Sequence, residues 1–312
     1  MTSPAIDARG LTKSFGDHRV LDGIDLSVPA GTVFALLGPN GSGKTTTVKI
    51  LSTLSRADAG EVSVAGLDTR TDREAICGKI GLTGQFAAVD TLLTGRENLM
   101  MMARLRHLPK AEAHERVERL LIDFDLVDAA DRRVGDYSGG MTRRLDLAMT
   151  LVGEPSIIFL DEPTTGLDPR SRRAVWDTVR DLVARGTTIF LTTQYLEEAD
   201  HLADRIAVLD RGRIVAEGTA AELKRLVPGG HIKIAFPDAG ELDRARAHFP
   251  SAVDAQEENT LAVPGGDGIS AIRDILTTLD DAGIEAAGIS VHTPDLDDVF
   301  LTITGRAAVT TP

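Results

Sequence analysis

The chain has 312 residues, 42% of them hydrophobic and 26% charged, which is typical of a globular protein with more than one domain. Its formal net charge of −13 argues against a nucleic-acid-binding surface, so we expect no nucleic-acid partner. We expect no signal peptide, and no run approaches the ~18 apolar residues of a membrane-spanning helix. The single cysteine, Cys77, excludes an intramolecular disulfide, and we expect it to serve as a small hydrophobic side chain.

The first third of the chain has the alternation of apolar and polar residues that strands show. Apolar residues recur over 5–37, with turn residues such as Gly16 between them, and a further strand pair fits 60–67. This pattern predicts an antiparallel β layer in this part of the chain. Phe15 ends one of these strands, and the residues alone leave two interpretations. Its ring stacks on an adenine base, or it is a half-buried strand aromatic.

A glycine-rich loop, GPNGSGKTT, follows the apolar run 33–37 and precedes a helical pattern. It satisfies G-x-x-x-x-G-K-[ST], in which glycines let backbone N–H groups point at phosphates and the helix N-terminus adds partial positive charge. We expect Lys44 to reach the β- and γ-phosphates and the Thr45 hydroxyl to hold Mg²⁺. The predicted nucleotide-binding residues of the loop are Gly38, Pro39, Asn40, Gly41, Ser42, Gly43, Lys44, Thr45 and Thr46.

Residues 94–126 are amphipathic with a helical period, and Met100, Met101 and Met102 follow one another in this stretch. Three consecutive side chains cannot share one helix face, so we expect two of them in the core. The alternative is an adaptable surface for a partner, to which the flexible methionine side chain is suited.

A Ser-Gly-Gly motif within Tyr137–Met141 precedes a further predicted helix, TRRLDLAMTLV. Arg143 and Arg144 lie near the start of this helix, against the preference of the helix dipole. We expect a solvated helix face here, and the alternative is an anion that approaches this helix end.

The next strands carry polar side chains at their ends. The apolar run 157–160 predicts a strand buried on both faces, and Asp161 and Glu162 follow it directly. A second buried run, 187–193, ends in Gln194. Carboxylates at such a strand end indicate a ligand site, because ligands of α/β sheets lie at the carboxyl ends of strands. With a helix at 196–203 and a strand at 206–209, the alternation predicts an α/β core.

The pattern starts afresh near residue 228, so we expect a nucleotide-binding domain over 1–227, with a helical subdomain at about 86–150, and an accessory domain over 228–312. The accessory domain has the βαβ-like spacing of a small α+β, ferredoxin-like fold. Its predicted elements are strands at 231–236, 260–263 and 284–292, a helix at 239–248, and a helix that carries Ile269, Ile272, Ile275, Leu276 and Leu279.

In order along the chain, GPNGSGKTT, Gln85, YSGGM, IIFLDEP, GLDP and TTQYLEEAD resemble the motifs of the ATP-binding subunit of an ABC transporter. The resemblance covers about residues 5–225. GQFAAVD, TTQYLEEADHLADRIAVLD and LDDVFLTITG resemble the daunorubicin-resistance type of drug exporter, which extends it over most of the C-terminal domain. It implies a phosphate-loop NTPase core with an antiparallel β subdomain and a helical signature subdomain.

The resemblance also implies roles for single residues. Phe15 takes the adenine-stacking position, Gln85 senses Mg²⁺ and the attacking water, and Asp161 holds Mg²⁺ through water. Glu162 is the general base, and Asp168 lies in the loop that reaches across a dimer. The signature residues that contact the γ-phosphate of a second subunit are Ser138, Gly139 and Gly140. The family usually has histidine where Gln194 stands, and glutamine where Met141 stands. We expect Gln194 still to sense the γ-phosphate, without a positive charge.

The function implied is an ATPase that powers export of a hydrophobic drug or lipid-like compound, with ATP and Mg²⁺ as ligands. Two chains would close head to tail around two ATP molecules. A separate permease would be required, and the chain would lie peripherally at the cytoplasmic face of the membrane, with its docking groove between Gln85 and about Leu105. Two alternatives stand beside this hypothesis: a soluble ABC-type ATPase that acts on ribosomes or DNA, and a C-terminal domain that serves mainly in dimerisation or regulation.

Overall fold

The computed structural model describes residues 4–85, 87–226, 230–255, 258–264, 269–292 and 295–306. The chain divides into two compact units, Met1–Ala220 and Ala221–Pro312. The division falls slightly before the domain boundary expected after residue 227, because most of helix α8 (Ala220–Lys224) belongs to the second unit. The two units are described separately below.

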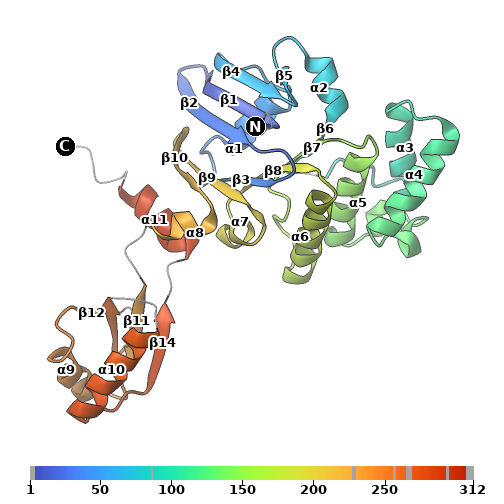
Figure 1. The fold of residues 1–312 in the computed structure, drawn as a ribbon. Helices are drawn as coiled ribbons and strands as arrows, with labels where there is room; N and C mark the ends of the chain where they lie inside the picture. Colours follow the sequence, from blue (N-terminus) through green and yellow to red (C-terminus); the bar gives the residue numbers. More distant parts are fainter. Residues whose placement is uncertain are drawn as a thin grey trace. The chain divides into compact units, whose positions relative to one another are not determined.

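A six-stranded sheet forms the centre of the first unit (Figure 1). Five strands are parallel, and β10 pairs antiparallel at one edge. In spatial order the strands are β10 (Arg213–Gly218), β9 (Arg205–Asp210), β3 (Val33–Leu37), β8 (Thr188–Thr193), β7 (Ile157–Asp161) and β6 (Ile80–Thr83). The carboxyl ends of the parallel strands therefore meet along one edge, and the sequence motifs follow directly on these ends.

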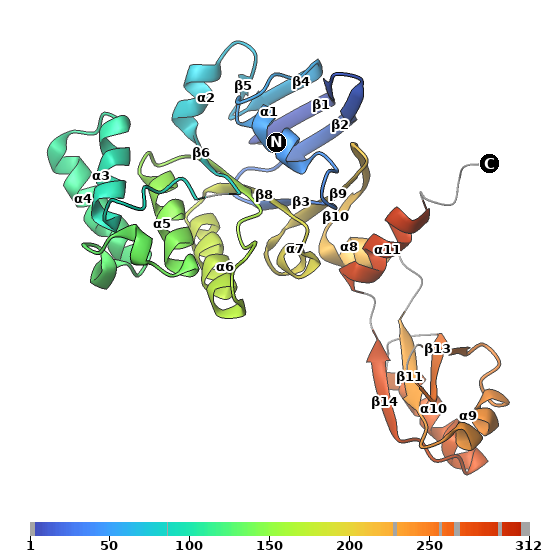
Figure 2. The same ribbon diagram turned by 180° about the vertical axis from the view of Figure 1, so that it is seen from behind.

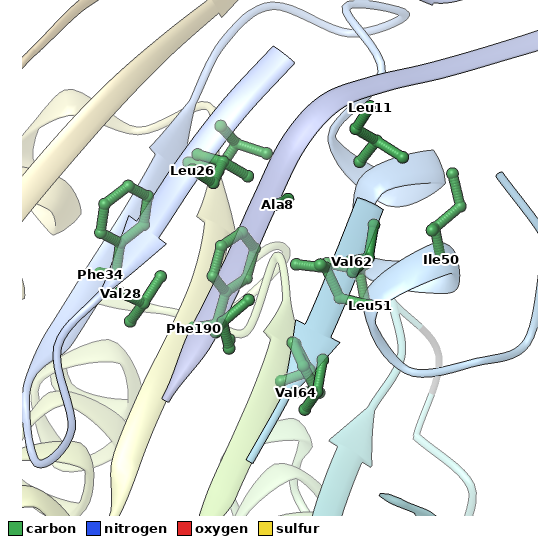
Figure 3. Close-up of a cluster of buried hydrophobic side chains, with 14 of the residues drawn as sticks. Ala8, Leu11, Leu26, Val28, Phe34, Ile50, Leu51, Val62, Val64 and Phe190 are labelled. Carbon is green, nitrogen blue, oxygen red and sulfur yellow. The ribbon is translucent and has the colours of Figure 1, made fainter. Parts of the chain in front are cut away.

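A second, antiparallel sheet covers one face of the central sheet. Its strands, in spatial order, are β2 (His18–Val28), β1 (Ile6–Phe15), β4 (Ala59–Val64) and β5 (Leu67–Asp68). Helix α1 (Lys44–Leu51) contacts both sheets. Buried apolar side chains from both sheets and α1 form one core, in which the Phe34 and Phe190 rings stack with centroids 5.7 Å apart (Figure 3). This confirms the predicted antiparallel layer on an α/β core.

Helices cover the opposite face of the central sheet (Figures 1 and 2). They are α5 (Gly139–Leu151), α6 (Pro169–Ala184) and α7 (Leu196–Leu202). The predicted helical stretch 94–126 is two helices, α3 (Gly95–Leu105) and α4 (Lys110–Asp123), which contact each other and α5. Thr94 and Glu97 form a capping box that fixes the start of α3. Short helices complete the unit: α2 (Arg73–Lys79), η1 (Val127–Ala129) and η2 (Val134–Asp136).

The second unit contains a four-stranded antiparallel sheet in the order β12-β13-β11-β14. The strands are β11 (His231–Ala235), β12 (Val253–Asp254), β13 (Thr260–Pro264) and β14 (Gly288–His292). Helix α9 (Ala239–Arg246) connects β11 to β12, and α10 (Ile269–Ala282) connects β13 to β14. This order is that of the predicted ferredoxin-like βαββαβ fold. Helix α11 (Leu296–Arg306) ends the described chain. No described helix of either unit is both long and apolar enough to cross a membrane.

Candidate nucleotide-binding site

The glycine-rich loop joins β3 to α1 and depends on close backbone packing. Gly38 lies against β9, where a Cβ would come 2.3 Å from the carbonyl oxygen of Leu209. Gly43 caps α1 at φ 114°, and a Cβ there would come 2.6 Å from the Leu21 side chain. Only glycine fits both positions, because one lacks space and the other also needs the left-handed region.

Lys44 is buried, with 4% exposure, at the first position of α1. Its Nζ donates hydrogen bonds to the carbonyl oxygens of Gly38 at 2.8 Å and Pro39 at 3.1 Å, and lies 3.5 Å from Glu162 Oε1. Burial lowers the pKa of the Lys44 ammonium, and the Glu162 carboxylate opposes that shift. The loop therefore holds the Lys44 ammonium at the place where phosphate oxygens are expected, and those oxygens can replace its two carbonyl acceptors.

The hydroxyl of Ser42 has no hydrogen-bond partner among the described residues, although it is buried inside this loop. A buried polar atom without a partner costs free energy, which a phosphate oxygen at this position would recover. Both the Lys44 ammonium and the Ser42 hydroxyl of this loop therefore suit a ligand that carries phosphate groups.

Asp161, the last residue of β7, and Glu162, which follows it, face different groups. Asp161 Oδ1 accepts hydrogen bonds from the Thr192 hydroxyl at 2.5 Å and the Thr45 hydroxyl at 3.3 Å. Glu162 has a φ of 50° in the left-handed region, and its N–H donates to the Thr192 carbonyl oxygen at 3.1 Å. This conformation is strained for a residue other than glycine, and such strain is concentrated at functional sites. It lets one carboxylate face Thr45 and the next face Lys44.

Lys44, Thr45 and Glu162 border one cavity of about 430 Å³, whose lining also includes Phe15, Asn40 and Gln85, whereas Asp161 lies outside the lining found among the described residues. The Phe15 side chain is 56% exposed, and Lys13 Nζ lies 5.3 Å from the centre of its ring. The fold therefore leaves this ring available to a ligand rather than half-burying it. Four segments that are distant in sequence meet here.

The signature residues lie elsewhere on the unit. None of Ser138, Gly139 and Gly140 is among the described residues that line this cavity. Ser138 caps α5 by accepting a hydrogen bond from the N–H of Met141 at 3.3 Å, and both Ser138 and Gly139 are exposed. The motif therefore presents a free helix N-terminus at the surface.

Two further predicted residues also lie outside the lining of this cavity, within the described chain. Asp168 caps α6, and hydrogen bonds from Ser171 and Arg170 lower the pKa of its carboxyl. Gln194 is half-buried at the end of β8. One chain thus assembles the loop, the carboxylates, Gln85 and Phe15, but not the signature.

Three expectations about other residues were wrong. Arg143 is buried rather than solvated, because it hydrogen-bonds with carbonyl groups of other segments. Cys77 is exposed, not a buried apolar residue. None of Met100, Met101 and Met102 is fully buried, because the core side of α3 is filled by Leu99 and Ala103 instead.

The doubly wound sheet, the phosphate loop and the paired carboxylates define a phosphate-loop ATPase with the helical signature subdomain of an ABC protein. The ABC transporter family profile matches residues 21–165. The chain is 50% identical to the daunorubicin resistance ATP-binding protein DrrA2 of Streptomyces coeruleorubidus, over 98% of this chain and 97% of that protein. It is 46% identical to the daunorubicin/doxorubicin resistance ATP-binding protein DrrA of Streptomyces peucetius, over 97% and 93%. It is 38% identical to the Nod factor export ATP-binding protein I of Burkholderia lata, over 96% and 97%.

Solved structures of ABC ATP-binding subunits have a similar fold. An ATP-binding subunit of an ABC transporter superposes with a TM-score of 0.64 at 27% identity, over 71% of this chain and 92% of that one. The dimeric post-hydrolysis state of the cassette MJ0796 bound to ADP and Pi gives 0.62 at 25% identity, over 69% and 98%. The chain belongs to the ABC transporter family, as an ATP-binding subunit of the daunorubicin/doxorubicin-resistance type. It is an ATPase.

Proposed function

We propose that this chain powers the export of a hydrophobic drug or lipid-like compound through a separate permease, by ATP-driven head-to-tail dimerisation. The observation that carries the proposal is the separation of the signature from the chain's own phosphate loop. The helix N-terminus at Ser138 is exposed and does not border the cavity around Lys44, among the described residues. A helix N-terminus is a ready site for a phosphate, and a second chain would supply that phosphate.

Within one chain, each residue of the cavity has a distinct part in ATP hydrolysis. Lys44 exchanges its two carbonyl acceptors for phosphate oxygens, and Phe15 stacks on the adenine ring. Glu162 accepts the proton of the attacking water, from a position 3.5 Å from the Lys44 cation. Gln85 orients that water, and Gln194, which follows β8 outside the lining of the cavity, donates a hydrogen bond to the γ-phosphate when ATP is bound.

The oxygens of Thr45 and Asp161 suit Mg²⁺, which binds through one or two protein oxygens together with substrate phosphates. When bound, Mg²⁺ neutralises charge on the phosphates. Thr192 keeps Asp161 in place by donating its hydroxyl proton at 2.5 Å.

The permease docks in a groove of about 270 Å³ next to Gln85. We name it the docking groove, and its lining comprises Ser52, Leu54, Cys77, Ile80, Gly81, Leu82, Ala88, Met102, Arg106, Asp146, Met149 and Thr150. Its exposed lining is mainly apolar, with Leu54 59% exposed, as suits a short segment of a membrane protein. Ala88 and Met102 are the only described lining residues that fall in the segment expected from the sequence, Gln85 to about Leu105, and the groove gives Met102 a partner-facing role. Met100 and Met101 line a neighbouring cavity on α3.

The single exposed cysteine of the chain, Cys77, tests this docking directly. The chain is purified from membranes together with its permease, and the rate of Cys77 modification by a maleimide is compared with that of the free chain. We expect the permease to slow the reaction at Cys77. A Cys77→Ser variant that carries Glu115→Cys, at an exposed position of α4 outside the groove, should react equally fast in both samples. Equal rates for Cys77 would contradict the docking site, and ATPase activity that the permease and its drugs do not change would contradict the transport function.

A further inference from the structure

Arg143 and Asp146 form a buried ion pair on α5, the helix that follows the signature. Arg143 is 6% exposed and Asp146 is 3% exposed, and Arg143 Nη1 lies 3.0 Å from Asp146 Oδ2. Burial lowers the pKa of the Arg143 guanidinium and raises that of the Asp146 carboxyl, and each charge opposes the other's shift. Removing two charges from water is costly, so this pair needs further hydrogen bonds to persist.

The guanidinium of Arg143 supplies these bonds to two other segments. Its Nε donates to the carbonyl oxygen of Pro163 at 2.8 Å, and its Nη1 donates to that of Gly84 at 2.9 Å. Pro163 follows the proposed base Glu162, and Gly84 precedes Gln85. The rigid fork of arginine can serve acceptors from separate segments at once, which a lysine ammonium cannot reproduce.

Asp146 extends the contact to the docking groove. Its Oδ1 accepts a hydrogen bond from the N–H of Ala88 at 3.0 Å, and both residues line that groove. Gly84 and Ala88 bracket Gln85, so the pair holds the Gln85 segment at both ends. The same side chains thereby join the groove, the Gln85 segment and the residue after Glu162.

We propose that Arg143 and Asp146 are positioning residues that couple occupancy of the docking groove to the placement of Glu162. The inference rests on the proposed roles of the groove and of Glu162. A permease segment that shifts Ala88 moves Asp146, and through Arg143 it moves the Pro163 carbonyl next to the base. Coupling of this kind is reciprocal, so ATP binding also alters the groove.

The test uses the full chain with both charges removed together, Arg143→Met with Asp146→Leu. Replacing a buried pair by apolar residues is often neutral for stability, so this double variant should melt near the wild-type temperature. We expect its kcat to fall by about 10- to 100-fold with little change in KM for ATP, because the base loses its placement. Arg143→Lys should lose kcat in the same way. A double variant that has both the wild-type melting temperature and the wild-type kcat would overturn the proposal.

The matched control is Arg144→Met, on the same helix. Arg144 donates to Asp125 and to the carbonyl oxygen of Phe124, away from the site, so this variant should keep wild-type kcat. A second readout is independent of turnover: ATP should change the maleimide reaction rate of Cys77 in the wild type and leave it unchanged in the double variant. The same ATP effect in both proteins would also overturn the proposal.

The role of Glu162 and the coupling through Arg143 can be tested separately. Wild-type turnover in Glu162→Gln would contradict the role of the base itself, whatever the Arg143 variants do. An inactive Glu162→Gln beside fully active Arg143 variants would contradict only the coupling.

Discussion

The two signature glycines give a matched pair of substitutions whose effects should separate folding from catalysis. A Cβ at Gly140 would come 2.4 Å from Ser171 Oγ and 2.9 Å from its Cβ, whereas a Cβ at Gly139 meets only Leu167, at 3.7 Å. Overpacking of this kind costs about 1–3 kcal/mol. We therefore expect Gly140→Ala to unfold at lower temperature than Gly139→Ala, by about 2–4 °C for each kcal/mol in a unit of this size.

For Gly139→Ala, by contrast, we expect ATPase activity to be lost without a loss of stability. Gly139→Ala adds a methyl group to an exposed surface that we propose faces the partner's nucleotide, so it should retain stability and lose most ATPase activity. Thermal unfolding and steady-state ATPase assays of both variants check this. In a double-mutant cycle, Ser171→Gly should recover the stability lost in Gly140→Ala. Full ATPase activity in Gly139→Ala would contradict the role of the signature, and wild-type stability in Gly140→Ala would contradict the close packing of Gly140 against Ser171.

Three further predictions concern single residues. Phe15→Ala should raise the KM for ATP about tenfold, because loss of base stacking costs about 1–3 kcal/mol, and a ring without that role would leave KM unchanged in steady-state assays. Asp161→Asn should raise the Mg²⁺ concentration needed for half-maximal ATPase activity, which a magnesium titration measures. Burial raises the pKa of Glu198, opposed by hydrogen bonds from Thr164 and Trp176 and by Arg172. Its folded state therefore loses stability as the pH rises above the unfolded pKa of about 4.3. Glu198→Gln should raise the unfolding free energy at pH 8, with a gain that fades towards pH 4, and a gain independent of pH would contradict this.

The phosphate loop could be predicted from the sequence because its requirements are local. A strand, glycines, Lys44 and a helix start follow one another within a few residues. The reason for Gly38 is not local, since the carbonyl oxygen that excludes a side chain belongs to Leu209 on another strand. The pattern therefore predicted the residue without its physical cause.

Arg143 shows where prediction from the sequence fails. Its burial depends on carbonyl groups of Gly84 and Pro163, which only the folded chain brings to α5. A charge pair with Asp146 three residues on was the available signal, since residues i and i+3 are neighbours on a helix. The prediction that two of Met100, Met101 and Met102 lie in the core was wrong for a related reason. Helical period alone does not show which residues of a helix face a groove.

A nucleotide site shared by two chains can be detected from the mass of Glu162→Gln in solution with MgATP. We expect a dimer with ATP and a monomer without it, because the variant binds ATP and hydrolyses it slowly. Adding Gly139→Glu should abolish the dimer while keeping the fold. An acidic residue suits the first turn of a helix but repels a partner's phosphates. A variant that stays monomeric with ATP, or a dimer that Gly139→Glu leaves intact, would contradict a nucleotide site shared by two chains.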